Sequence, residues 1–116
     1  MKDEGRIVVA GVCGSGKSTL VQGLRKLGYD AHTVAQEHSY VPKMWQMSNP
    51  GVLIYLDADL VTVCQRRKVQ WGEDRLVEQR KRLAHAREQR DLYIDTNSLT
   101  IEEVLELAKN FLRQRF

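Results

Sequence analysis

Residues 11–18, which we call the phosphate loop, follow the pattern G-x-x-x-x-G-K-[ST] in full. This pattern is typical of segments that bind nucleotide phosphates, because glycines let successive backbone N–H groups point toward one anion. We expect Lys17 to contact the β- and γ-phosphates and the Ser18 hydroxyl to bind Mg²⁺. The predicted nucleotide-binding residues here are Gly11, Val12, Cys13, Gly14, Ser15, Gly16, Lys17, Ser18 and Thr19.

The elements around the phosphate loop are those that this chemistry requires. An apolar, β-branched run at 7–10 predicts a buried strand before the loop, and apolar residues at helical spacing over 18–27 predict a helix after it. The N-terminus of such a helix adds partial positive charge to the site. A chance match in a glycine-rich turn is the alternative, and the flanking strand and helix argue against it.

Strands alternate with helices along the rest of the chain. Further strands are expected at 29–34, 52–56 and 92–94. Helices are expected at 59–69, at 74–90 and from the capping box at 100–103 onward, and a short helix is expected to begin at Pro42. Gly28 is expected to end the first helix. The apolar face of the last helix is expected to contain Ile101, Val104, Leu105, Ala108, Phe111 and Leu112. This order predicts an α/β fold in which a small, mostly parallel sheet of about four strands is covered on both faces. We expect all 116 residues to form one domain.

Basic residues concentrate between positions 66 and 90, although the net charge is only +3. Such a segment can neutralise nucleotide phosphates, bind nucleic acid or form a solvated helix face. We rank nucleic-acid binding last, because the segment matches no nucleic-acid module. The helix at 74–90 has only a thin apolar line, so it is expected to be largely exposed or to face a partner, for example a second copy of the chain in an oligomer. Trp45 is assigned to the core.

The chain lacks the features of exported or membrane proteins. Its first six residues are mostly charged, and no apolar run approaches the length of a membrane span. Cys13 and Cys64 make no disulfide framework. We therefore expect a soluble, cytoplasmic protein with no membrane partner.

Read in order, the phosphate loop, Leu53–Ala58, Arg66 and Tyr93–Thr96 resemble the small P-loop kinases of the P-loop NTPase superfamily, of the shikimate, gluconate and adenylate kinase type. The resemblance implies a three-layer α/β/α fold and a lid-like segment at about 66–90. It also implies that Arg66 stacks on the nucleotide base. The loop at Thr96, Asn97 and Ser98 would then wrap the base.

The chain also departs from that pattern. These kinases usually have a helix-strand-helix segment after the second strand, which holds the acceptor, whereas only residues 42–49 stand here. The strand that ends at Asp57 can serve as the metal-binding strand, so that Asp57 holds Mg²⁺ through water. The alternative is that Asp57 caps the next helix.

An acid that orients the acceptor is also implied by the resemblance. Glu37 is our candidate, because the second strand in these kinases ends near such acids. His38 can act as the base instead, although a surface histidine without a catalytic role is the preferred interpretation. Arg67, Arg80, Arg82 and Arg87 can close over the phosphates, but a solvated helix face is preferred for each. The candidate catalytic residues are thus Lys17, Glu37 and Asp57.

Two functions remain open from the sequence. The first is a minimal kinase that transfers the γ-phosphate of ATP or GTP, with Mg²⁺, to a small molecule. The second is a regulatory or slowly NTP-hydrolysing module that binds the same nucleotide but has no acceptor site. The acceptor itself is unknown.

Overall fold

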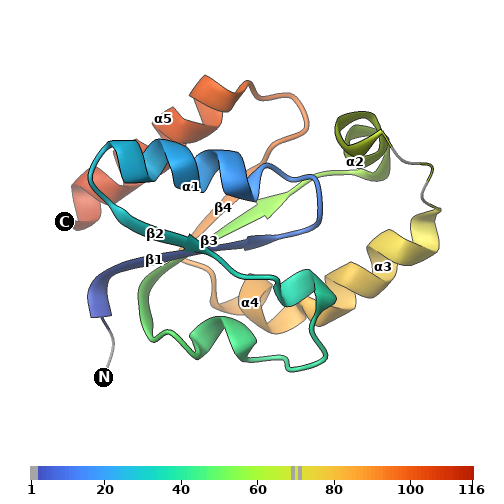
Figure 1. Cartoon of the computed structure of the whole chain (residues 1–116), viewed down its shortest axis with the longest axis horizontal. Helices are drawn as coiled ribbons and strands as arrows, with labels where there is room; N and C mark the ends of the chain where they lie inside the picture. Colours follow the sequence, from blue (N-terminus) through green and yellow to red (C-terminus); the bar gives the residue numbers. More distant parts are fainter. Residues whose placement is uncertain (1–2, 69, 71) are drawn as a thin grey trace.

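The computed structural model describes residues 3–68, 70 and 72–116, and its centre is a four-stranded sheet. The strands are β1 (Asp3–Gly11), β2 (Asp30–Thr33), β3 (Pro50–Asp57) and β4 (Leu92–Asp95). All neighbouring pairs are parallel, and the order is β2-β1-β3-β4. Helices cover both faces of the sheet (Figure 1). The predicted α/β class with a small parallel sheet is therefore confirmed.

The helices form one layer on each face of the sheet. They are α1 (Lys17–Lys26), α2 (Leu60–Arg67), α3 (Glu73–Arg82), α4 (Ala84–Gln89) and α5 (Ile101–Arg115). Two 3₁₀ turns, η1 (Gln36–His38) and η2 (Met44–Gln46), lie between β2 and β3. Side chains of α1 and α5 share one core with the sheet, and side chains of η2, α3 and α4 share the other.

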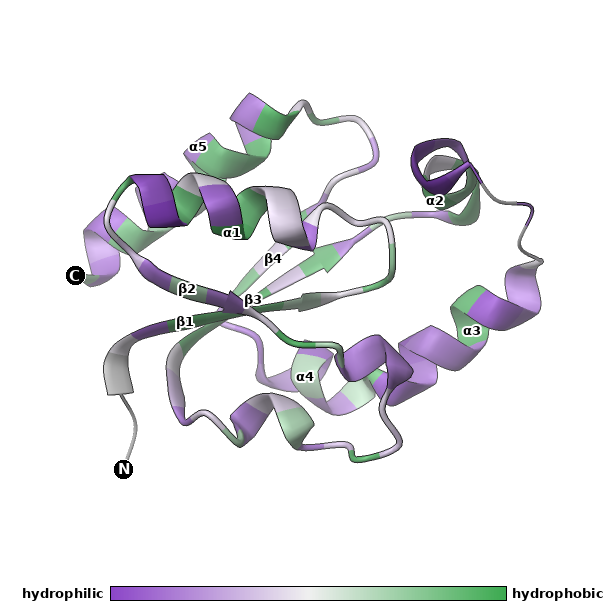
Figure 2. Cartoon of the chain, viewed as in Figure 1, coloured by the Kyte–Doolittle hydropathy of each residue, from purple (hydrophilic) through white to green (hydrophobic). Residues whose placement is uncertain are grey.

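The two central strands are buried on both faces, which explains their unbroken apolar sequence. Every residue from Val52 to Leu56 is at most 1% exposed. Parallel strands with helices on both sides have this pattern, because neither face of the sheet meets water. Figure 2 shows hydrophobic residues along β1 and β3 and mainly hydrophilic residues along α3. The carboxyl ends of β1 and β3 lead directly into the phosphate loop and α2.

Local end signals act as expected. Gly28 ends α1 with a φ of +93°, and its N–H donates to the Arg25 carbonyl oxygen at 3.0 Å. The Thr100 hydroxyl accepts from the Glu103 N–H at 3.1 Å, while the Glu103 carboxylate accepts from the Thr100 N–H at 2.9 Å. This capping box starts α5.

The expectation for residues 74–90 was right about burial and wrong about one continuous helix. The segment is largely exposed, and Leu76, Leu83 and Ala86 of its apolar line are fully buried against the sheet, but it forms two helices that break at Leu83. Val69 and Trp71, which the sequence placed at the end of one helix and in the interruption after it, lie outside the described residues.

Two other expectations can be compared with the structure. Trp45 is 7% exposed, and its Nε1 donates to Nδ1 of His85 at 3.0 Å, so its place in the core is confirmed. Ile101, by contrast, is 63% exposed, although the sequence placed it on the apolar face of the last helix. In the part of the chain that the structure describes, no helix has the length and apolar character needed to cross a membrane.

Candidate functional site

The phosphate loop joins β1 to α1 and exposes the start of that helix. Gly14 and Gly16 have φ angles of +83° and +101°, which residues with side chains rarely adopt. Gly16 is the N-cap of α1 and has no side chain to bind the first amides of the helix. Those amides and the helix dipole favour an anion at this position.

The Lys17 side chain lies back across the phosphate loop. Its Nζ donates to the Gly11 carbonyl oxygen at 2.8 Å and lies 3.4 Å from the Val12 carbonyl oxygen. Its third partner is Oε2 of Glu37, with which it forms an ion pair. An ammonium group has three N–H donors, so the protein itself uses all of them.

Glu37 reaches Lys17 because β2 pairs directly with β1. η1 follows β2 and carries Glu37, whose side chain is only 5% exposed. Oε2 also lies 3.9 Å from Nε2 of His38, which is mostly exposed. Oε1 is buried and accepts no hydrogen bond among the described residues. The acid predicted near the phosphates thus contacts the loop lysine, and one of its oxygens has no partner.

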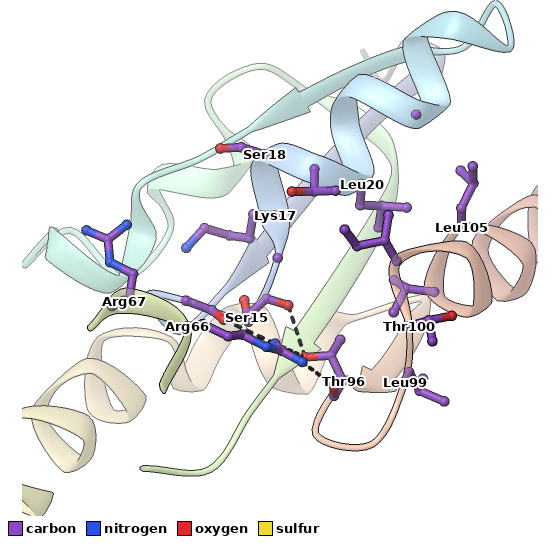
Figure 3. Close-up of a pocket in the computed structure, with 16 residues that line it drawn as sticks. Ser15, Lys17, Ser18, Leu20, Arg66, Arg67, Thr96, Leu99, Thr100 and Leu105 are labelled. Atoms are coloured by element: carbon purple, nitrogen blue, oxygen red, sulfur yellow. Dashed lines mark hydrogen bonds between the residues drawn. The ribbon is translucent and has the colours of Figure 1, made fainter. Parts of the chain in front are cut away.

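A cavity of about 570 Å³ opens in front of the phosphate loop (Figure 3). One end is polar and contains the loop, Arg66 and Thr96, while the other end lies between α1 and α5 and is apolar. The lining residues are Gly14, Ser15, Gly16, Lys17, Ser18, Thr19, Leu20, Gly23, Arg66, Arg67, Thr96, Leu99, Thr100, Ile101, Val104 and Leu105. A molecule with a polyanionic end and a flat apolar end fits this division.

Arg66 bridges the two sides of the polar end. Its guanidinium donates to Thr96 Oγ1 at 2.9 Å and to the Gly14 carbonyl oxygen at 3.1 Å, and it also bonds the Thr96 carbonyl oxygen. Thr96 is 2% exposed, and its hydroxyl lies 3.0 Å from the Ser15 carbonyl oxygen. α2, the phosphate loop and the loop after β4 are therefore tied together at the cavity.

Both carboxylate oxygens of Asp57 already accept hydrogen bonds from nearby residues. Oδ1 accepts from the Ala58 N–H at 2.9 Å, and Oδ2 accepts from the Tyr93 hydroxyl at 2.8 Å. Arg80 approaches Oδ1 at 3.5 Å. Burial and the bond to Asp57 raise the pKa of Tyr93. Asp57 does not cap α2, because Asp59 does so through Thr62.

Several predicted residues therefore meet at the cavity and others do not. Lys17, Ser18, Thr19, Arg66 and Thr96 line it. The Asn97 side chain turns away and accepts from the Asp59 N–H at 2.7 Å, and neither Asn97 nor Ser98 is among the lining residues.

The sequence does not reveal the apolar lining of this cavity. Leu99 belongs to no motif, and Thr100 belongs to the capping box. Helical spacing predicts only that Val104 and Leu105 lie on the inner face of the last helix. Helical spacing alone does not show that part of that face borders a cavity, because this depends on how closely α1 and α5 approach. Gly23 sets that approach: a Cβ there would lie 3.1 Å from the Leu105 side chain.

The cationic residues of α3 also contact neighbours, although the sequence favoured a solvated face for them. Arg82 donates to the Glu37 carbonyl oxygen at 3.2 Å and to the Tyr40 hydroxyl at 2.8 Å. Gln79 accepts from the Cys13 N–H at 2.9 Å. A second cavity, of about 560 Å³, lies between η1 and α3 and is lined by His38, Asp74, Arg75, Glu78, Gln79 and Arg82. Its lining contains neither Glu37 nor a residue of the phosphate loop, but Arg82 and Gln79 in the lining contact Glu37 and Cys13 through their side chains.

Comparison with known proteins adds one distant relative. No family model matches the chain. A nucleotide-binding protein of Pseudoalteromonas atlantica is 27% identical over 150 residues, which cover 89% of this chain and 52% of that protein. The chain thus spans about half the length of this relative. Because the aligned stretch is longer than this chain of 116 residues, the relative has residues there that this chain lacks.

Proposed function

We propose that the chain binds Mg²⁺-ATP or Mg²⁺-GTP at the phosphate loop and transfers the γ-phosphoryl group to a small molecule. The observation that carries the proposal is the loop itself. Its glycines have positive φ angles, its lysine amine lies against the first loop carbonyls, and both face a cavity large enough for a nucleotide. The name of the distant relative supports nucleotide as the ligand.

The polar end of the cavity would hold the phosphates and the metal. Amides of the phosphate loop and Lys17 face the β- and γ-phosphates, and Thr19 faces the α-phosphate. Ser18 lines the cavity, and Glu37 has a buried oxygen without a partner, so hard oxygen donors suited to Mg²⁺ are present. Bound Mg²⁺ would neutralise charge on the phosphates. The metal role predicted for Asp57 would require that residue to leave Tyr93 and Ala58.

The base would lie beside Arg66 and the loop after β4. Because Arg66 bonds Thr96 directly, the base would lie against the guanidinium where it borders the cavity and not between these two residues, with the apolar residues that follow Thr96 beside it. Asn97 and Ser98, which the sequence also assigned to the base, would act through their backbone.

Replacement of Arg66 by Ala should reduce the affinity for ATP more than the affinity for inorganic triphosphate, which has no base. A cation-π contact contributes about 0.5 to 2 kcal/mol, so a loss of roughly twofold to thirtyfold is expected for ATP. Calorimetric titration of both ligands measures the difference, with Arg113→Ala on the exposed side of α5 as the charge-matched control. An equal loss for both ligands would reassign Arg66 to the phosphates or to the scaffold.

The second cavity is the proposed place for the acceptor, because two of its lining residues, Arg82 and Gln79, contact Glu37 and the phosphate loop. In the transfer step an acceptor hydroxyl oxygen bonds to the γ-phosphorus as the bond to the β,γ-bridging oxygen breaks. The hydroxyl proton passes to the Glu37 carboxylate, and the nucleoside diphosphate leaves. Arg82 holds the backbone of Glu37 in place.

Transfer of labelled γ-phosphate into a pool of nucleosides, nucleotides and hydroxylated metabolites tests the kinase proposal. We expect the native chain to label at least one acceptor and Glu37→Gln to label it at least about a hundredfold more slowly, as for loss of a general base. Lys17→Ala controls for contaminating kinases, so product that it forms equally well is contamination. Saturable Mg²⁺-nucleotide binding without any labelled acceptor would contradict the kinase proposal.

The second candidate is a nucleotide-binding module without an acceptor site, and the sheet order favours it. β2 lies next to β1, and only η1 and η2 separate β2 from β3. The acceptor segment of the kinases that the chain resembles therefore has no counterpart between these strands. This candidate predicts nucleotide loss at a rate that no added acceptor changes.

A further inference from the structure

The ion pair between Lys17 and Glu37 places a carboxylate at the amine that would bind phosphate. Two loop carbonyls hold the Lys17 amine, and Glu37 takes the donor that remains. A phosphate oxygen arriving at this amine has to replace the Glu37 carboxylate or share the amine with it. Both groups are anions, so Glu37 competes with the ligand for the same positive charge.

The Glu37 side chain is buried and its backbone is held, so the carboxylate is not free to turn into water when phosphate arrives. Its side chain is 5% exposed, and its backbone carbonyl is held by Arg82. His38, which lies 3.9 Å from Oε2, is the other basic side chain that approaches the carboxylate among the described residues. Oε1 accepts no hydrogen bond from any residue that the structure describes. Once phosphate takes the Lys17 amine, the buried carboxylate needs a new positive partner.

A divalent cation that arrives with the phosphates supplies that partner. A metal-free triphosphate would bring several negative charges next to a buried carboxylate, and like charges at short range inside a protein repel strongly. A triphosphate that carries Mg²⁺ brings positive charge to the same place. Carboxylate oxygen is also a preferred ligand of Mg²⁺, directly or through water.

We propose that Glu37 makes triphosphate binding at this loop depend on a divalent cation. Without ligand, the Glu37 carboxylate neutralises Lys17. When a triphosphate binds, the carboxylate repels the metal-free form and attracts the form that carries Mg²⁺. This inference rests on the proposed triphosphate site. It gives Glu37 a metal-linked role, whereas the sequence analysis expected Asp57 to hold Mg²⁺ through water. Glu37 can take this role because β2 pairs with β1, and this pairing places η1 against the phosphate loop.

The test is calorimetric titration of ATP in excess Mg²⁺ and of ATP in EDTA. The native chain should prefer Mg²⁺-ATP by roughly tenfold or more, and Glu37→Gln should reduce that preference several-fold, mainly by strengthening metal-free binding. Glu37→Asp keeps the charge and should keep the preference. Glu106→Gln, the same chemical change on the exposed face of α5, should leave it unaltered. Should Glu37→Gln not fold, Glu37→Ala removes the same charge.

The outcomes are separable. A native preference that persists in Glu37→Gln overturns the inference, as does native binding without any preference for Mg²⁺. Loss of the preference in Asp57→Asn alone would return the role to Asp57 and overturn it as well. If the native chain binds ATP under neither condition, the proposed function fails instead.

Discussion

Replacement of Lys17 by Ala should reduce the affinity for Mg²⁺-ATP by at least tenfold and up to several hundredfold. A hydrogen bond between charged groups contributes about 1.5 to 3 kcal/mol, which corresponds to roughly tenfold to more than a hundredfold. Mg²⁺ that arrives with the phosphates would become the counter-ion of Glu37 in the complex, so the expected loss is that of the contact between Lys17 and the phosphates.

Calorimetric titration of the two proteins measures the loss, with Lys26→Ala in the exposed last turn of α1 as a charge-matched control. Thermal unfolding checks that each variant folds. A double variant, Lys17→Ala with Glu37→Gln, should be more stable than Lys17→Ala alone, because the uncompensated buried charge is removed. Equal affinities of the native chain and Lys17→Ala would refute phosphate binding by this loop.

Replacement of Gly11 by Ala should destabilise the fold by at least about 3 kcal/mol, the upper part of the range for overpacked sites. Gly11 is the last residue of β1 and pairs with Leu56 on β3. A Cβ at Gly11 would lie 2.2 Å from the Leu56 carbonyl oxygen and 2.9 Å from Ser15 Oγ. The closer atom belongs to the backbone of a central strand, so it cannot turn away as a side chain can.

Urea unfolding measures this effect as a change in midpoint. Gly28→Ala is the matched control, since Gly28 has a φ of +93° but no atom within 4 Å of an added Cβ. That variant should lose only about 1 to 2 kcal/mol, the penalty for a left-handed residue with a side chain. A loss at Gly11 no larger than the loss at Gly28 would mean that β1 and β3 are farther apart here than the structure shows.

Features that depend on neighbouring residues could be read from the sequence. The phosphate loop needs glycines at set positions and a lysine and serine directly after them, and all eight residues are consecutive. The end of α1 at Gly28 and the start of α5 at Thr100 are likewise decided within a few residues. Apolar runs predicted the strands because a strand buried on both faces admits few polar residues. The α/β class and the parallel sheet follow from these local patterns.

Contacts between distant segments needed the tertiary structure. Glu37 lies 20 residues from Lys17 in the chain, and it meets the lysine only because β2 pairs with β1. Strand order is decided by the packing of the whole chain, so no local pattern in the sequence predicts it. The same reason explains why the sequence did not show the break of the 74–90 helix at Leu83, a residue that is fully buried against the sheet. It also explains why Asp57, at the end of a strand that suits a metal-binding acid, is held instead by Tyr93 from the neighbouring strand.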